Sequence, residues 1–181
     1  MEKVITLGNK VRVSDPCYGT DTWCAGEVDN VLEGKYVVDI ETSDEGMWGT
    51  RVKSLRAIHT DHADKMLLFC NVAPFEVGVD SGQAGIYDAE YYNKYHTVDD
   101  CDDDWYDDIC NLTDPFGTKD DKCVVSSSGF GDGCYICYLA KDTTGKVVGF
   151  EIMFIDDEEE DEDDYYEEDY EEEEDDEDDD I

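Results

Sequence analysis

Cationic side chains are scarce in this chain of 181 residues. Lys and Arg together number 13 against 51 Asp and Glu, which gives a formal net charge of -38. Affinity for nucleic acid comes largely from Lys and Arg clusters that neutralise phosphates, and anionic lipid repels a chain of this sign. We therefore expect no direct binding to nucleic acid and no binding to a membrane.

Long apolar runs are missing as well. No stretch approaches the roughly 18 apolar residues of a membrane-spanning helix, and residues 1–8 have neither the apolar segment nor the cleavage pattern of a secretory signal. The eight cysteines are an even number, as in disulfide-rich secreted proteins. This N-terminus instead favours a reducing, intracellular compartment, in which the cysteines stay reduced.

The acidic residues are concentrated at the C-terminal end. Of the 25 residues from Asp156 to Asp180, all but three tyrosines are Asp or Glu, which leaves 22 acidic positions. Such a segment cannot bury enough apolar surface to offset about 1–2 kcal/mol of backbone entropy per residue. We predict one β-rich globular domain over residues 1–155 and a disordered polyacidic tail over residues 156–181. The domain is acidic too, so the tail should extend away from it.

Short β-branched or alternating runs, bounded by Gly, Asp, Asn or Pro, recur before the tail. They predict strands at residues 10–13, 36–40, 51–58, 75–79, 123–126, 134–140 and 147–155. Turn-forming residues at 128–133 and 141–146 separate the last three runs, which indicates an antiparallel meander with hairpin turns. Residues 147–155 are almost all apolar, which predicts a central strand covered on both faces.

Two short helices are expected between these strands, at residues 89–96 behind Asp88 as N-cap and at residues 102–112. In the second helix, Trp105 and Ile109 share one face. Aspartates crowd its first turn, where the helix dipole favours anions. The expected fold class is α+β and mostly β: an antiparallel sheet or sandwich with one or two short helices and a disordered acidic tail.

The acidic run before the second helix invites comparison with a calcium-binding loop. Asp100, Asp102 and Asp104 have the required i, i+2, i+4 spacing. Trp105 then occupies the position that needs Gly, and Asn111 occupies the position that needs a bidentate Glu. Weak screening of a charged face by Mg²⁺ or Ca²⁺ therefore fits the run better than a specific calcium site.

Cys134 and Cys137 have the spacing of a zinc or redox pair. On a strand, residues three apart point to opposite faces, so the pair cannot converge on one ion without a bend. Buried structural cysteines are favoured instead. We expect no metal and no cofactor. The sequence also lacks a nucleophile elbow, a dinucleotide fingerprint and a P-loop, which weighs against an enzyme.

Three loops are candidates for a functional site, because each places a carboxylate next to glycine or proline at the edge of an apolar strand. The candidate ligand-binding residues on these loops are Asp15, Tyr18, Asp80, Ser81, Gln83 and Asp132. If the three carboxylates converge, they could bind a cation or a cationic ligand. The alternative is that the aspartates only cap turns.

The same loops carry a resemblance to a known family. The segments concerned are Ser14–Tyr18, Trp23–Cys24, residues 34–51, Val79–Gly85 and Ser128–Tyr135. In this order they resemble the DUF4241 family, an uncharacterised family of phage and bacterial proteins, over roughly residues 10–155. The resemblance implies a β-rich domain in the cytoplasm of a bacterium or of a phage-infected host cell. It brings no activity, cofactor or catalytic residue, and it leaves the tail unexplained.

Two classes of function remain open. In the first, an interaction protein engages a basic host protein through residues 156–180 by mimicking nucleic acid. An extended tail has one charge per ~4 Å, close to the ~3.4 Å spacing of phosphates along one DNA strand. Its tyrosines could stack on Arg. A tail that only solubilises is the alternative. In the second class, the loop carboxylates belong to a small-ligand-binding or hydrolytic domain.

Overall fold

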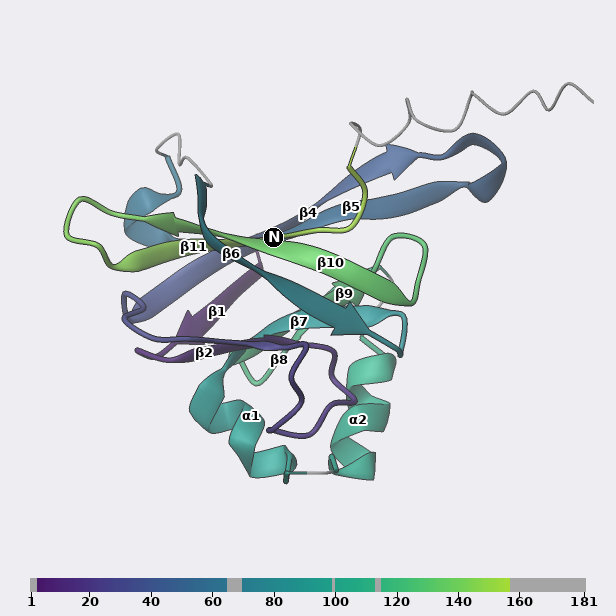
Figure 1. Cartoon of the computed structure of the whole chain (residues 1–181), viewed down its shortest axis with the longest axis horizontal. Coiled ribbons are helices and arrows are strands. Elements are labelled where there is room, and N and C mark those ends of the chain that lie inside the picture. Colours follow the sequence, from purple (N-terminus) through teal and green to yellow (C-terminus); the bar gives the residue numbers. More distant parts are fainter. Residues whose placement is uncertain (1–2, 65–69, 99, 113–114, 157–181) are drawn as a thin grey trace, which may run out of the picture.

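Two antiparallel sheets stack to form a β-sandwich in the computed structural model of the protein, and two helices lie against one of them (Figure 1). The structure describes residues 3–64, 70–98, 100–112 and 115–156. The observed fold is mostly β with two helices, so the expected fold class is confirmed.

The larger sheet has six strands in the order β1-β4-β5-β11-β10-β6. They are β1 (Lys3–Leu7), β4 (Gly34–Asp44), β5 (Thr50–His59), β6 (Cys70–Val79), β10 (Gly133–Lys141) and β11 (Val147–Met153). The smaller sheet has five strands in the order β3-β2-β7-β9-β8. They are β2 (Val11–Ser14), β3 (Gly26–Val28), β7 (Gln83–Asp88), β8 (Phe116–Lys119) and β9 (Cys123–Ser127). Two single-turn 3-10 helices follow β4 and β5, at Gly46–Trp48 and Thr60–His62.

The main hydrophobic core lies between the two sheets. Val13 of β2 and Ile86 of β7 meet Leu55, Phe150 and Ile152 of the larger sheet there, and all five side chains are fully buried. Each such side chain contributes about 1.5–3 kcal/mol to folding through its removal from water. Strand alternation explains why Phe150 and Ile152 of β11 both point into this layer, since successive side chains of a strand point to opposite faces.

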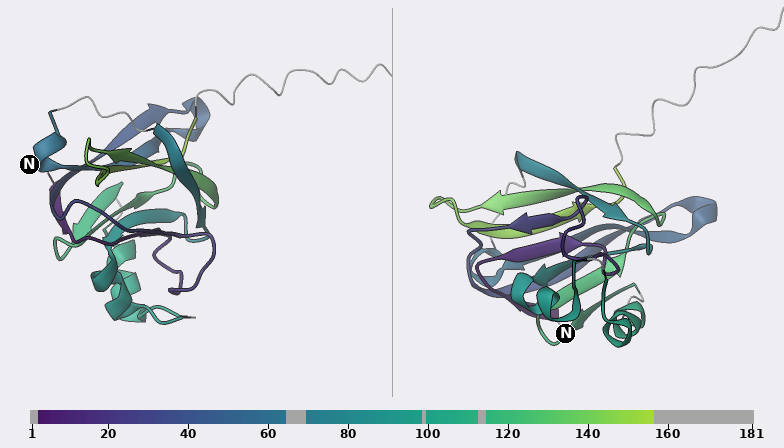
Figure 2. Two further views of the ribbon diagram at one scale, coloured as in Figure 1. Left: turned by 60° about the vertical axis from the view of Figure 1, so that its left-hand side comes forward. Right: turned by 60° about the horizontal axis from the view of Figure 1, so that its bottom comes forward.

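A second, smaller apolar cluster lies between the smaller sheet and the helices α1 (Ala89–Tyr95) and α2 (Asp103–Cys110). Both predicted helices are therefore confirmed, with slightly shorter ends. Asp88 caps α1 by accepting a hydrogen bond from the Tyr91 amide, and Asp102 caps α2 by accepting one from the Trp105 amide at 2.8 Å. Figure 2 shows the helices against the smaller sheet from two further sides.

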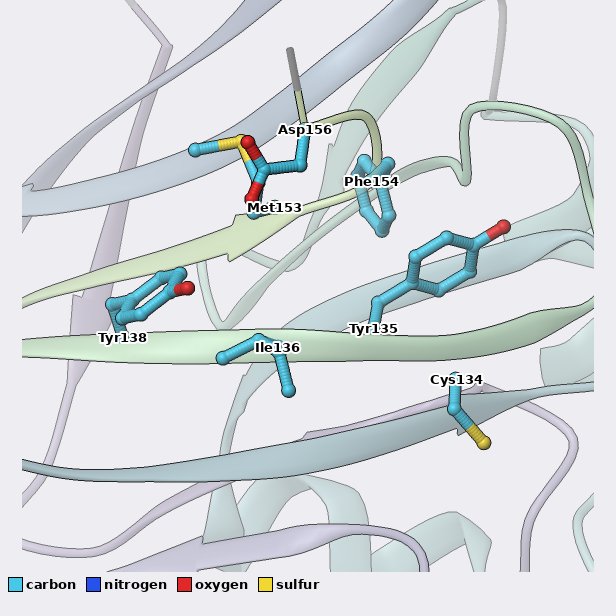
Figure 3. Close-up of a pocket in the computed structure, with 7 residues that line it drawn as sticks. All are labelled: Cys134, Tyr135, Ile136, Tyr138, Met153, Phe154 and Asp156. Carbon is cyan, nitrogen blue, oxygen red and sulfur yellow. The ribbon is translucent and has the colours of Figure 1, made fainter. Parts of the chain in front are cut away.

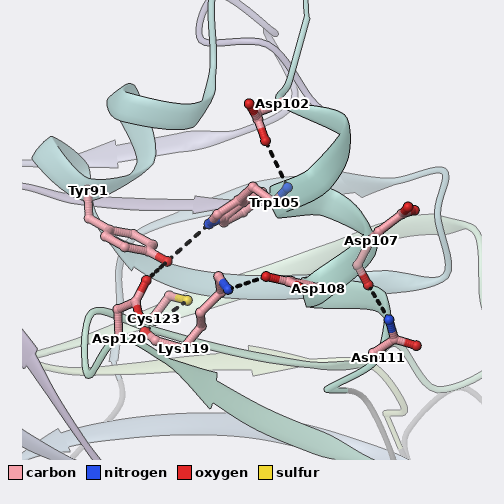
Figure 4. A network of polar contacts seen from close by, with 9 residues as sticks. All are labelled: Tyr91, Asp102, Trp105, Asp107, Asp108, Asn111, Lys119, Asp120 and Cys123. Atoms are coloured by element: carbon pink, nitrogen blue, oxygen red, sulfur yellow. Dashed lines mark hydrogen bonds and ion pairs between the residues drawn. The ribbon is translucent and has the colours of Figure 1, made fainter.

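Polar contacts also fasten the helices to the sheet (Figure 4). The indole N–H of Trp105 donates to the Tyr91 hydroxyl at 3.0 Å, and that hydroxyl donates to Asp120 at 2.9 Å. Lys119 of β8 forms an ion pair with Asp108 of α2. Because Trp105 is almost fully buried, its N–H would otherwise lack a partner, at a cost of about 1–3 kcal/mol.

The predicted strands are all present, and four short strands were not predicted: β1, β3, β7 and β8. The predicted meander is only half correct. Strands β10 and β11 pair in antiparallel register, but β9 belongs to the other sheet. Residues 128–133 therefore do not form a hairpin; they cross from the smaller sheet to the larger one.

Strand β11 is central, as predicted, between β5 and β10. Its predicted coverage on both faces is wrong for part of its length. Phe150 and Ile152 point into the core, whereas Glu151 and Met153 between and beyond them are only partly buried. Glu151 instead forms an ion pair with Arg56 of β5 at 3.1 Å. The larger sheet thus keeps one face toward the solvent.

The predicted tail begins at the last described residue, so its predicted disorder lies outside the described residues. The boundary between residues 155 and 156 stays a prediction for the same reason. Within the described ranges, no helix is long and apolar enough to cross a membrane.

Candidate functional site

The three loops that the sequence singled out lie next to one another, where the chain passes between the two sheets. The turn at residues 80–82 joins β6 of the larger sheet to β7 of the smaller one, and residues 128–132 join β9 to β10. Gly133 pairs with Val79, and the Ser128 amide donates to the Gly82 carbonyl at 3.0 Å. Asp15 follows β2 and reaches the same turn.

Asp15 joins the loop after β2 to the turn at residues 80–82. Its carboxylate is fully buried and accepts four hydrogen bonds of 2.8 Å each, from the amides of Cys17, Asp80 and Ser81 and from the Ser81 hydroxyl. A carboxylate has about four acceptor sites. All of them are used within the chain, so Asp15 has no capacity left to bind a ligand in this arrangement.

The other predicted site residues are more accessible. The Tyr18 hydroxyl donates to the exposed Asp80 carboxylate at 2.8 Å. Burial, followed by this hydrogen bond, raises the pKa of Tyr18, so its hydroxyl stays a neutral donor. Asp132 is exposed on the neighbouring turn, and Gln83 is half-buried with its Oε1 lacking a hydrogen-bond partner. Their role in ligand binding stays a prediction. We call Asp15, Tyr18, Asp80 and Ser81 the Asp15 cluster.

Side chains that the sequence did not flag hold the Asp15 loop in place. Tyr92 of α1 donates its hydroxyl to the Tyr18 carbonyl at 2.7 Å, and its ring stacks on His96 at a centroid separation of 3.6 Å. Arg12 donates to the carbonyls of Gly19 and Thr20. The contact of Tyr92 with Tyr18 joins residues 74 positions apart in the sequence, and no local pattern marks it.

Nucleophilic chemistry at this loop is disfavoured by its thiol. Burial, followed by hydrogen bonding and repulsion from Asp15, raises the pKa of Cys17 well above its usual value, so it stays protonated at neutral pH. The nearby His96 has one ring nitrogen 2.9 Å from the Pro16 carbonyl and the other 2.9 Å from the Tyr92 carbonyl. Neither nitrogen is placed to remove the thiol proton.

Metal-ligand geometry is not found in the described part of the chain, where no three His, Cys, Asp or Glu side chains gather in a way that could hold an ion. Cys137 is buried, whereas Cys134 is exposed on the same strand. The two thiols thus occupy opposite faces, as strand alternation predicted, and the expectation of a buried structural cysteine is confirmed for Cys137 and wrong for Cys134. None of the cysteine side chains that the structure describes forms a disulfide.

A small hollow of about 150 Å³ lies on the solvent face of the larger sheet, over β10 and β11 (Figure 3). It is lined by Cys134, Tyr135, Ile136, Tyr138, Met153, Phe154 and Asp156. Its volume suits one side chain of a partner and lies below the ~300 Å³ of common small-ligand sites.

A larger hollow of about 550 Å³, here called the tip groove, lies between the end of the β4–β5 hairpin and the crossing segment 128–132. It is lined by Asp44, Glu45, Trp48, Phe130, Phe154, Ile155 and Asp156. Trp48 is 67% exposed and Phe130 is 56% exposed. Sequence reasoning missed this groove because Trp48 and Phe130 lie far apart along the chain; the isolated apolar pair Met47–Trp48 in a polar turn was its only local signal.

One known protein family matches the chain. The family model described as "Protein of unknown function (DUF4241)" matches residues 11–152. The chain belongs to this family. No curated protein and no solved structure matches the chain.

The DUF4241 match runs from the start of β2 to the penultimate residue of β11. It includes the whole Asp15 cluster and the groove residues Trp48 and Phe130. The polyacidic residues after Asp156 fall outside it. The DUF4241 description names no activity, so any functional proposal has to come from the geometry and charge of the chain itself.

Proposed function

We propose that this protein is an interaction protein that binds a basic protein partner and competes with nucleic acid for it, in the cytoplasm of a bacterium or of a phage-infected cell. One observation carries the proposal: Asp156, where the polyacidic run begins, lines both the tip groove and the small hollow over β10 and β11. A folded surface with exposed aromatic rings and a dense run of negative charge therefore start at the same place.

The charge of the tail supplies the affinity in this proposal. A partner that binds nucleic acid presents Lys and Arg at phosphate spacing, and the 22 acidic positions between Asp156 and Asp180 offer a similar linear charge density. Three tyrosines within the run add ring faces on which Arg can stack. Such binding is strongly salt-dependent, because the exposed charges are screened within about 8–10 Å at physiological ionic strength.

Part of the positive charge of the domain is already paired with the chain's own carboxylates. Lys10 forms ion pairs with Glu27 and Asp29, and Lys119 forms one with Asp108. Arg56 is paired with both Glu41 and Glu151. Because these cations are already neutralised by the chain's own carboxylates, they compete weakly with an external basic partner for the tail.

The alternative, a small-ligand-binding or hydrolytic domain built on the loop carboxylates, has less support. The four acceptor sites of Asp15 are occupied within the chain, and the Cys17 thiol is held protonated. Asp80, Gln83 and Asp132 remain accessible, but they come without a partnered base and nucleophile.

A competition experiment tests the proposal. A fluorescent single-stranded oligonucleotide is bound to a synthetic arginine-rich peptide of about 20 residues, and the protein is titrated in while fluorescence anisotropy is followed. We expect the full chain to displace the oligonucleotide at ~50 mM salt and to lose this ability by ~500 mM. The matched control is the full chain with Asp→Asn and Glu→Gln changes throughout residues 157–180. Equal displacement by this control, or none by the natural chain at low salt, refutes the proposal.

A further inference from the structure

The tip of the β4–β5 hairpin is a preformed turn that presents apolar side chains to the solvent. The hairpin extends beyond the rest of the sandwich (Figure 1). At its end, the Glu45 amide donates to the Gly49 carbonyl at 3.0 Å, and the Trp48 amide donates to the Glu45 carbonyl at 3.1 Å. Met47 is 100% exposed. Because the backbone is already ordered, a partner that packs on this tip incurs a smaller entropic cost.

Three aromatic side chains from distant parts of the chain line the tip groove. Trp48 comes from the hairpin tip and Phe130 from the segment that crosses between the sheets, and Phe154 and Ile155 complete the apolar lining. The volume of about 550 Å³ falls within the ~300–1,000 Å³ range of sites that enclose a ligand or several side chains. Large exposed rings around such a hollow are typical of interaction sites.

The electrostatics of the tip groove favour a cationic occupant. Asp44, Glu45 and Asp156 contribute carboxylates to its lining. One cation close to this lining is Arg51, whose guanidinium lies 5.9 Å from the centroid of the Phe130 ring. That contact has the geometry in which a ring face attracts a guanidinium. It also makes Arg51 an internal competitor for any external arginine.

We propose that the tip groove binds an arginine-bearing segment of the basic partner, with the guanidinium against the Trp48 and Phe130 rings and its charge balanced by Asp44 and Glu45. This inference rests on the proposed function and deepens it, because it names the folded element that selects the partner. Arginine is favoured over lysine since its planar, weakly hydrated guanidinium stacks on aromatic faces. The tail then supplies charge, and the groove supplies selectivity.

The test uses the three tryptophans of the full chain as internal reporters. The probe is the short acetylated and amidated peptide Leu-Arg-Leu-Arg, which is titrated into ¹⁵N-labelled protein while the indole N–H signals are recorded by NMR. We expect the Trp48 signal to move and saturate. The signals of Trp23, which is 84% exposed, and of the buried Trp105 should stay in place. A peptide with citrulline in place of arginine keeps the shape but loses the charge, and it should bind far more weakly.

One substitution that weakens peptide binding and another that strengthens it distinguish a loss of groove contacts from a loss of folding. Trp48→Ala should weaken binding of the arginine peptide about 3- to 10-fold through loss of one ring face. Trp23→Ala is the matched control, another exposed tryptophan outside the groove, and should leave affinity unchanged. Arg51→Gln removes the internal competitor and a like charge, so it should tighten binding about two- to fivefold. A disordered hairpin could not produce that gain.

Three results would overturn the inference. The Trp23 and Trp48 signals could move equally, which indicates nonspecific attraction. The citrulline peptide could bind as well as the arginine peptide, which indicates a purely apolar site. The Trp48 signal could shift with protein concentration and not respond to added peptide, which indicates a second copy of this chain as the occupant.

The chain with a neutralised tail separates this inference from the proposed function. It should keep the Trp48 response to the short arginine peptide and lose displacement of the oligonucleotide. If the natural chain displaces the oligonucleotide but shows no Trp48 response, the groove inference fails and the proposed function stands. If the Trp48 response is present and displacement is absent, the competition with nucleic acid fails and the groove remains as an arginine-binding site.

Discussion

At the scale of single residues, a carboxylate that looked like a ligand-binding group proves to be a structural one. Asp15 joins the end of β2 to the turn between β6 and β7 through three hydrogen bonds, and it accepts a fourth from the Cys17 amide of its own loop. Sequence reasoning located this loop because Asp, Pro and Gly are informative about local backbone. It could not tell whether the carboxylate faces a ligand or amides of the chain, since that depends on a contact with residues 80 and 81.

Replacing Asp15 with Asn should therefore lower the free energy of unfolding by about 2–4 kcal/mol, because an amide presents N–H groups to backbone N–H donors and loses charged hydrogen bonds. Urea denaturation followed by fluorescence measures this. Asp132→Asn, on the exposed neighbouring turn, is the control and should change stability by less than about 0.5 kcal/mol. An Asp15→Asn variant as stable as the natural chain would contradict the structural role.

His96 gives the fold a dependence on pH. Burial lowers its pKa, while the carbonyls of Pro16 and Tyr92 oppose that shift and Arg12 adds to it. The folded state thus binds the proton more weakly than the unfolded chain, whose histidine titrates near pH 6.5. The stability that neutral His96 contributes is complete above about pH 6.5 and is lost as the pH falls through its lower folded value.

Comparison of the natural chain with His96→Gln isolates this effect, because the carboxylates titrate alike in both. The natural chain should lose more stability between about pH 7.5 and 5.5 than the variant does, as measured by urea midpoints at each pH. Parallel pH profiles for the two chains would show that His96 contributes nothing to the dependence.

At the scale of elements, local sequence signals predicted the helices correctly, but they did not predict which strands pair with each other. Both helices were found because caps and apolar spacing lie within a few residues of each other, as with Asp102 and Trp105. Strand β3 has only three residues, too few for a periodic signal. The turn at residues 128–133 was predicted to be a hairpin, because glycine-rich chemistry is the same whether the next strand pairs with the last or joins another sheet.

The cap of α2 provides a test at this scale. Asp102→Ala should destabilise the protein by about 1 kcal/mol, whereas Asp102→Asn, which also accepts a hydrogen bond at an N-cap, should cost little. Thermal denaturation of both variants measures the difference. If Asp102 were instead a calcium ligand, millimolar calcium would raise the melting temperature of the natural chain and not that of the Asn variant; we expect no such rise.

At the scale of the whole molecule, the excess of negative charge dominates. With 51 acidic and 13 basic residues, repulsion within the chain outweighs its exposed ion pairs, which contribute at most about 1 kcal/mol each. This imbalance and the mostly β fold were both predictable from the residues alone. The tip groove could not be predicted, because Trp48 and Phe130 line one hollow only once the larger sheet and the crossing segment are in place.

Moderate salt should therefore stabilise the folded protein. Raising NaCl from about 10 to 200 mM shortens the screening length from ~30 Å to less than 10 Å, and the urea midpoint should increase. A neutral osmolyte at the same osmolality serves as the control for effects unrelated to charge. A midpoint that falls with salt would mean that attractive pairs, and not repulsion, dominate the folded state.

The central position of β11 has a consequence for synthesis in the cell. This strand is made after every other strand described, yet it lies between β5 and β10 in the middle of the larger sheet. While the ribosome is still translating it, β5 and β10 each have one unpaired edge, and the main core lacks Phe150 and Ile152. Folding is therefore a late event that joins distant segments at once, and a nascent chain that stalls before residue 147 is a substrate for chaperones and not a smaller folded domain.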